Sequence, residues 1–452
     1  RWLIPVAVVL LLGILLFAVQ QILSGQQAAR VAGYLAQARQ EVTDSQEGAT
    51  ADRRQHLMRG YDLAQKAVNA DVRSSSAQQL AARIQGELDT LNGVTRLIGL
   101  NLLFDFGARS PAPVLTLAPT GDPTGLGGPA TGTATATLAP LLAPPQSGDY
   151  LSQVIVHGDD AFLLDRGSGR LYRYTLSAGQ YSTLLAPGTQ VDLVGTVGDK
   201  ASVGQLLYLT WRPTADGGDL AVLDDTHIAY IWTPATGQWQ AFALGTADKL
   251  NRPRDLGAYD GNLYLLWAKP GQVSKWAAGA YSGPPSDWLS AAASGELRSR
   301  SPVAMAIDGD IHLLLDDGRI TTLSAGEVKK TITLPVWPPL ASPLAIFTNE
   351  SSNSIYVVEA ADKRIIRVDK ATGAVQGQLK APADTTAFDS LRNIYVDEAA
   401  GKIYVLSNKK LYVALLPAPP VGPGTPVPAL PNGNPTPTAG QNPLPTTPTA
   451  QP

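Results

Sequence analysis

Four short strand signals and three turns follow one another in SPLAIFTNESSNSIYVVEAADKRIIRVDKATGAVQGQLK, residues 342–380. Each signal is a run of β-branched or apolar residues, which favours a strand. Polar or glycine-containing pairs that are typical of tight turns separate the runs. The stretch therefore predicts a four-stranded antiparallel meander, with strands at Leu344–Phe347, Ile355–Val358, Ile365–Val368 and Val375–Leu379.

A sheet this small cannot bury both of its faces alone, so it predicts similar copies before and after it in the chain. Three copies open with a proline, at Pro253, Pro302 and Pro343. A period of about 40 to 50 residues with four strands is typical of a β-propeller blade. We therefore predict a mainly β fold, a six-bladed β-propeller over residues 149–416. A seven-bladed ring is the alternative if Val191–Trp211 contains a further blade.

The sixth copy has only three strand signals before Pro417. Its last strand would leave an exposed edge unless a strand from elsewhere in the chain pairs with it. Residues 133–142, TATATLAPLL, alternate threonine and alanine and lie just before the first copy. We expect this segment to pair with the sixth copy and so close the ring.

The N-terminal segment of the sequence is apolar. No charged residue occurs from Trp2 to Val19, and the run to Ile22 has the length of about 20 residues that a membrane-spanning helix requires. We expect residues 1–23 to form a transmembrane helix, with a buried core helix and a cleaved signal peptide as alternatives. Arg1 precedes the run and few basic residues follow it, so the rest of the chain is expected outside the cytoplasm.

Residues 24–106 are rich in residues that favour helix. Two apolar stripes at helical spacing predict helices that pack on each other as a stalk, and a partner-binding coiled coil is the alternative. Residues 107–148 and 417–452 are rich in Pro, Thr and Gly, which predicts a low-complexity linker and a disordered tail. The stripes are Leu57, Tyr61, Ala64 and Val68 in one helix and Leu80, Ile84, Leu88 and Leu91 in the next.

The composition excludes several classes of function. The chain of 452 residues contains no cysteine, so disulfides, thiolate catalysis and cysteine-ligated metals are excluded. The formal net charge is −3, which gives no reason to expect nucleic acid as a partner.

Parts of one pattern recur in the copies, best in the first, fourth, fifth and sixth: a proline that opens the first strand, a turn with Asp-Gly or Asn, a tyrosine-rich second strand and a basic, apolar third strand. This pattern resembles the NHL repeat and related six-bladed propellers, and the resemblance implies a fold more than a function. The matching residues are Asp165 with Gly169-Arg170-Leu171-Tyr172-Arg173, Asp308-Gly309, Gly318-Arg319-Ile320, Arg364-Ile365-Ile366-Arg367-Val368-Asp369 and Gly401-Lys402-Ile403-Tyr404.

The order of membrane helix, helical stalk, linker and propeller is similar to the extracytoplasmic half of bacterial membrane signalling proteins. Their cytoplasmic half is a Ser/Thr kinase or a PPM-type protein phosphatase. The resemblance implies a single-pass protein of the bacterial cytoplasmic membrane, with any such domain before Arg1. We assign no catalytic residue, because no Gly-rich nucleotide loop and no His-Arg-Asp triplet is present.

Enzymatic signals within the propeller are weak. His157, His227 and His312 fall in different copies and form no metal-binding pair, so no metal or cofactor is expected. Gluconolactonase-type propellers hold calcium in the channel with acidic and amide side chains. A membrane-tethered hydrolase or lactonase with a channel metal is therefore the alternative function, for which the acidic candidates are Asp255, Asp260, Asp308 and Asp389.

Arginines gather in the connections that lead into three of the copies. If the copies are in register, these side chains lie on one rim of the ring. Guanidinium groups bind carboxylates and phosphates in a bidentate manner, so the rim predicts an anionic ligand: a protein, a peptide or a cell-wall polymer. A solvated rim without a ligand is the alternative. We thus expect a membrane-anchored extracytoplasmic sensor or interaction module, with the ligand at Arg252, Arg254, Arg298, Arg300 and Arg392.

Overall fold

The computed structural model describes residues 3–106, 151–214, 217–245, 253–268, 271–383 and 385–419, without the side chains of residues 3–19 and 22–24. The predicted closing segment 133–142, the linker 107–148, Arg252 and most of the tail lie outside the described residues. The predicted membrane helix falls largely on residues whose side chains are not described.

Three helices precede the sheets: α1 (Leu3–Asp44), α2 (Thr50–Ala70) and α3 (Ser75–Leu91). The Ser74 side chain caps α3 by accepting a hydrogen bond from the backbone N–H of Ala77 at 3.4 Å. Leu57 of α2 and Ile84 of α3 are fully buried against each other and against Ala38 of α1. The two apolar stripes of the sequence therefore face one another in a helical hairpin.

In the part of the chain that the structure describes, no helix combines the length and the apolarity that crossing a membrane requires.

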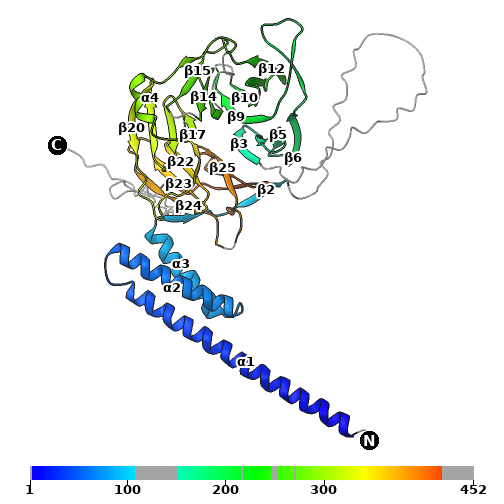
Figure 1. The fold of residues 1–452 in the computed structure, drawn as a ribbon, viewed down its shortest axis with the longest axis vertical. Coiled ribbons are helices and arrows are strands. Elements are labelled where there is room, and N and C mark those ends of the chain that lie inside the picture. Colours follow the sequence, from blue (N-terminus) through cyan, green and yellow to red (C-terminus); the bar gives the residue numbers. More distant parts are fainter. Residues whose placement is uncertain are drawn as a thin grey trace, which may run out of the picture. The chain divides into compact units, whose positions relative to one another are not determined.

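Six sheets of four or five strands form a six-bladed β-propeller after the helices (Figure 1). The predicted six-fold repeat is confirmed, and Pro253, Pro302 and Pro343 begin the first strands of blades 3, 4 and 5. Each blade is an antiparallel meander. Blade 1 is β3 (Leu151–His157), β4 (Asp160–Asp165), β5 (Arg170–Thr175) and β6 (Gln180–Leu185); blade 2 is β9 (Leu206–Arg212), β10 (Asp219–Asp224), β11 (Ile228–Thr233) and β12 (Gln238–Ala243).

The remaining blades have the same order. Blade 3 is β13 (Pro253–Tyr259), β14 (Asn262–Trp267), β15 (Val273–Trp276) and β16 (Ser286–Asp287); blade 4 is β17 (Pro302–Ile307), β18 (Ile311–Leu315), β19 (Ile320–Ser324) and β20 (Glu327–Ile332). Blade 5 contains β21 (Pro343–Phe347), β22 (Ser354–Glu359), β23 (Arg364–Asp369) and β24 (Val375–Lys380); blade 6 contains β25 (Leu391–Asp397), β26 (Lys402–Ser407) and β27 (Lys410–Leu415).

The innermost strands surround the axis of the propeller. Each of β3, β9, β13, β17, β21 and β25 contacts the inner strand of the next blade, and β25 contacts β3. The apolar core lies between neighbouring blades, as where Leu314 of blade 4 and Ile355 of blade 5 are fully buried in one cluster. Each small sheet thus buries both of its apolar faces by packing against the blades on either side.

Two short strands between α3 and residue 106 complete the outer edges of blades 5 and 6. Strand β1 (Val94–Arg96) pairs in parallel with β24, and β2 (Asn101–Asp105) pairs antiparallel with β27. The hydroxyl group of Tyr174 in blade 1 also donates to the carbonyl oxygen of Leu103, at 2.9 Å. The ring is thus closed by β2, and the edge that we assigned to residues 133–142 is occupied. Residues 94–105, expected in the helical stalk, instead contain β1 and β2 of the propeller. Gly93, with φ of 64°, follows the end of α3, and Gly99, with φ of 65°, lies in the turn between the two strands.

Two insertions interrupt the repeat. Strands β7 (Gln190–Asp192) and β8 (Lys200–Ser202) form a two-stranded hairpin between blades 1 and 2, in the region where a seventh blade was the alternative. Helix α4 (Ala291–Leu297) lies between blades 3 and 4.

Candidate functional site: the central channel

The channel of the propeller is a cavity of about 1000 Å³ that is lined by residues from the inner strands of all six blades. Because a propeller presents the free edges of its inner strands to this space, backbone N–H and C=O groups line it together with side chains. The channel is therefore suited to a ligand with hydrogen-bonding groups.

A β-bulge occurs at the same point in every inner strand. In each blade the pairing with the second strand skips one residue near the start of the inner strand. Bulges re-aim side chains and are frequent next to functional sites. We call this end of the channel the bulge mouth, and the skipped residues are Ser152, Leu207, Arg254, Val303, Leu344 and Arg392.

The residue after the bulge joins its blade to the next one. The Asn393 Oδ1 atom accepts from the Val154 N–H at 3.2 Å, and the Gln153 Oε1 atom accepts from the Leu209 N–H at 2.9 Å. In each pair the acceptor follows the bulge of one blade and the N–H lies two residues after the bulge of the next. These side chains satisfy backbone groups that would otherwise face the channel without a partner.

Asp255 has the same position in blade 3. One carboxylate oxygen accepts from the Met305 N–H of blade 4 at 2.8 Å, and the other accepts from the Leu256 N–H at 2.9 Å. Burial raises the pKa of Asp255 to about 7, although the two backbone hydrogen bonds and the charge of Arg166 act in the opposite direction. The channel thus contains a carboxylic acid whose charge changes near neutral pH.

Cationic side chains lie at the bulge mouth. Arg254 and Arg392 are exposed and line the cavity, and Arg166 reaches it from the turn between β4 and β5. The Arg166 guanidinium lies 4.8 Å from the ring centroid of Tyr208, and the Tyr208 hydroxyl group donates to the Pro253 carbonyl at 2.8 Å. Burial raises the pKa of Tyr208, so this hydroxyl group stays neutral and acts as a donor.

Two of the predicted rim residues lie elsewhere. Arg298 is at the C-terminus of α4 and lines a separate cavity with Gln272 and Asp287, and Arg300 follows it. Neither lines the channel. Both residues lie between the end of α4 and Pro302, before β17 begins. The channel arginines Arg254 and Arg392 are instead the bulge residues of their inner strands, and the bulge residue of blade 4 is Val303. Arg166 was missed because it comes from a turn after the second strand, where the sequence pattern gives no signal for the channel.

The candidate histidines have structural surroundings. His312 is buried, with ring nitrogens 3.1 Å from Thr322 Oγ1 and 3.0 Å from Asp308 Oδ1. His157 stacks on Trp211 with ring centroids 3.8 Å apart. Of the acidic candidates, Asp389 forms an ion pair with Lys363 outside the channel.

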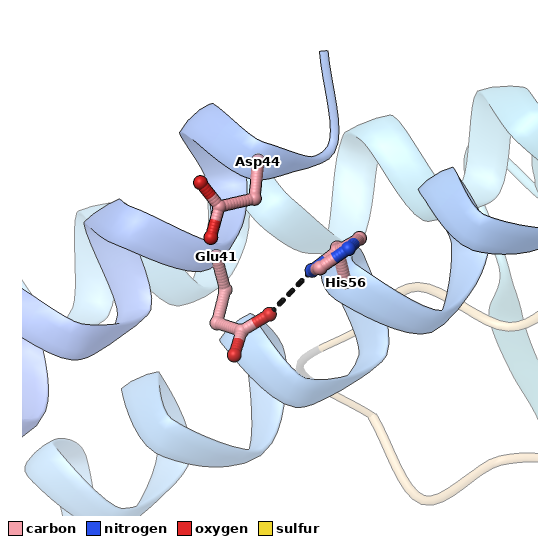
Figure 2. Close-up of side chains that lie close together, drawn as sticks. All are labelled: Glu41, Asp44 and His56. Atoms are coloured by element: carbon pink, nitrogen blue, oxygen red, sulfur yellow. Dashed lines mark hydrogen bonds and ion pairs between the residues drawn. The ribbon is translucent and has the colours of Figure 1, made fainter. Parts of the chain in front are cut away.

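Among the described residues, one group of His, Asp and Glu side chains is close enough to share an ion, and it lies in the helices. Glu41 and Asp44 of α1 and His56 of α2 place their ligand atoms within 4.8 Å of one another (Figure 2). The His56 Nδ1 atom is 2.7 Å from Glu41 Oε2, and Asp44 accepts from Gln40. The acidic candidates of the channel do not converge in this way.

No protein-family model matches the chain, and no curated protein matches it in sequence. Solved structures with a similar fold include one in a nidogen/laminin complex, with 13% identity over 52% of this chain and 81% of that chain and a TM-score of 0.36. YCF48 bound to a D1 peptide has 12% identity over 60% and 79% of the two chains and a TM-score of 0.38. A structural genomics protein of unknown function from Bacteroides thetaiotaomicron has 14% identity over 61% and 71% and a TM-score of 0.41.

Proposed function

We propose that the propeller is an interaction module that holds an acidic segment of a protein or peptide at the bulge mouth of its channel. The observation that carries the proposal is the position of Arg166, Arg254 and Arg392 around a cavity of about 1000 Å³. Guanidinium groups in such a setting favour carboxylates through charge-assisted hydrogen bonds. The neighbouring acid, Asp255, is partly neutral near pH 7 and opposes this positive field only weakly.

We further propose that the module is a membrane-anchored extracytoplasmic sensor, held by the apolar segment that begins at Trp2. The support is the sequence, which has no charged residue from Trp2 to Val19. Protease added to sealed right-side-out vesicles should then digest the propeller side of the chain. Full protection of the propeller in intact vesicles, with digestion after detergent is added, would contradict this topology.

The ligand proposal is tested by selecting peptides from a random phage-displayed library on the full chain. Peptides that wild type retains should be enriched in Asp and Glu, and the variant Arg166→Gln/Arg254→Gln/Arg392→Gln should lose that enrichment. Arg298→Gln is the matched control, because Arg298 is also exposed but lies on α4. Equal enrichment on wild type and the triple variant, both folded by their melting temperatures, would refute the proposal.

A further inference from the structure

At three interfaces between neighbouring blades, a side chain of one blade accepts a hydrogen bond from a backbone N–H of the next. These side chains are Asn393, Gln153 and Asp255. The equivalent residue in blade 2 is Tyr208, whose hydroxyl group donates to the Pro253 carbonyl of the next blade. The pattern therefore shows what this position does: its side chain hydrogen-bonds the backbone of the neighbouring inner strand. All four side chains line the channel.

The two remaining positions are alanines. Ala304 follows the bulge of blade 4, and Ala345 follows the bulge of blade 5. The N–H groups that correspond to those of Val154, Leu209 and Met305 belong to Ile346 and Ile394. A methyl group cannot accept a hydrogen bond, and no side-chain acceptor among the described residues reaches either N–H.

The register places these two N–H groups on the channel side. Ile346 pairs with Val357 and Ile394 with Val405, in the same position after the bulge as Val154, which pairs with Leu163. Since alternate residues of an edge strand direct their N–H groups away from the partner strand, those of Ile346 and Ile394 point from the sheet into the cavity. Both residues line that cavity, and they are 8% and 2% exposed.

We propose that the N–H groups of Ile346 and Ile394 donate hydrogen bonds to carboxylate oxygens of the ligand, in the positions that the channel's own side chains occupy in other blades. The inference rests on the proposed function and gives the chemistry of its ligand. A carboxylate already has this role within the channel, because Asp255 accepts from Met305. Arg392 lies two residues before Ile394 and lines the same cavity, which favours a carboxylate over a neutral acceptor.

The test uses the full chain with ¹⁵N-labelled isoleucine and sodium acetate as the probe. The amide signals of Ile346 and Ile394, assigned through Ile→Val variants, should shift saturably with acetate and much less with sodium chloride at equal ionic strength. The Ile355 signal is the internal control, because that residue is fully buried in β22. Absence of a shift, or an equal response to chloride, would overturn the proposal.

A substitution that supplies the missing acceptor sharpens the test. Ala345→Asn gives blade 5 the side chain that Asn393 provides in blade 6, and it should occupy the Ile394 N–H. Acetate should then bind about tenfold more weakly as reported by Ile394, because a hydrogen bond to a charged group is lost, while the Ile346 signal still responds. An unchanged Ile394 response in the folded variant would contradict the assignment.

The peptide selection and the acetate titration test the proposed function and the carboxylate position independently. If acetate shifts both signals but no selected peptide displaces it, the two N–H groups bind a free carboxylate and the proposed peptide ligand is wrong. If acidic peptides bind without moving either signal, the interaction module stands and the carboxylate position is wrong.

Discussion

The Nε2 atom of Gln378 in β24 donates a hydrogen bond to the carbonyl oxygen of Asn92, the residue that ends α3, at 2.7 Å. The Oε1 atom of Gln378 accepts from the Arg364 guanidinium at 2.6 Å. Arg364 in turn forms an ion pair with Glu359, and both side chains are fully buried. The helices are therefore connected through one carboxamide to a buried charge pair inside blade 5.

Arg364→Met should strongly destabilise the propeller. It leaves the Glu359 carboxylate buried without its cation, a change that costs about 3–5 kcal/mol in the free energy of unfolding. Equilibrium unfolding in urea measures the loss. The double variant Arg364→Met/Glu359→Gln should recover a large part of it, because the glutamine carries no charge and still offers an oxygen to the Ala341 N–H. Equal losses in the single and double variants would contradict this account.

Interrupting β2 should lower the melting temperature of the whole ring. The double variant Asn101→Pro/Leu102→Pro removes two consecutive backbone N–H groups. Because N–H groups point alternately toward and away from the partner along an edge strand, one of the two is a hydrogen-bond donor to β27. The Leu102 side chain is 49% exposed, so lost packing contributes little. Differential scanning calorimetry should show a shift of several degrees.

Proline at Ala134, Ala136 and Leu138 is the control for ring closure, since that segment was the sequence-based candidate for the same edge. These substitutions should leave the melting temperature unchanged. A loss equal to that of the β2 variant would show that both segments contribute to the closed ring.

The repeated blades were predictable because their signals are local. The run Ile355–Val358 predicts β22, and Asp362-Lys363 predicts the turn before β23. Strands β1 and β2 were not predicted, because each is short and follows a long helical composition. Their partner strands lie far along the chain, since Val94 pairs with Gln378 and Asn101 pairs with Val413. Sequence pattern alone gives no information about such distant pairings.

The candidate site was predictable only in part. Arg254 and Arg392 lie at the channel because each directly follows the first residue of an inner strand, Pro253 and Leu391. The acceptor position after the bulge holds different residue types in each blade, so it has no common sequence signal. It becomes visible only when the six inner strands are aligned in space.

Asp255 should make stability depend on pH. Its pKa is about 7 in the folded protein and near the ordinary value of 3.8 in the unfolded chain, so the folded state binds the proton more tightly. The stabilisation of the folded state by the proton on Asp255 is complete when the pH is below 3.8, and it is lost as the pH rises toward 7. Between about pH 5 and pH 8, wild type should therefore lose more unfolding free energy than Asp255→Asn in urea titrations.

Asp389→Asn is the control for the pH experiment, because Asp389 forms an exposed ion pair with Lys363. Its pH profile should differ from that of wild type less than the profile of Asp255→Asn does, because the Asp389 side chain is half exposed and Asp255 is buried. If Asp255→Asn parallels wild type, the buried carboxyl does not titrate in this range.

Gly257→Ala should destabilise the contact between blades 3 and 4. A Cβ atom at residue 257 would lie 2.6 Å from the Cδ1 atom of Ile307 and 3.1 Å from the Met305 Cε atom. Because both contacts are with the ends of side chains that can shift, the loss in the free energy of unfolding should lie near the lower end of the about 1–3 kcal/mol that overpacking costs. Ile307→Val removes the Cδ1 atom and should offset part of the loss in the double variant. A strictly additive double variant in urea titrations would show that crowding against Ile307 is not the cause.

The pairing of β1 with β24 and of β2 with β27 has a mechanical consequence. A force applied along α3 reaches the ladders of two neighbouring blades directly, because Val94 follows the helix by only two residues. Detaching β2 from β27 also exposes the edge that closes the ring. Pulling the helices away from the propeller therefore separates β1 from β24 in blade 5, and then removes β2, the outer strand of blade 6 that packs against blade 1.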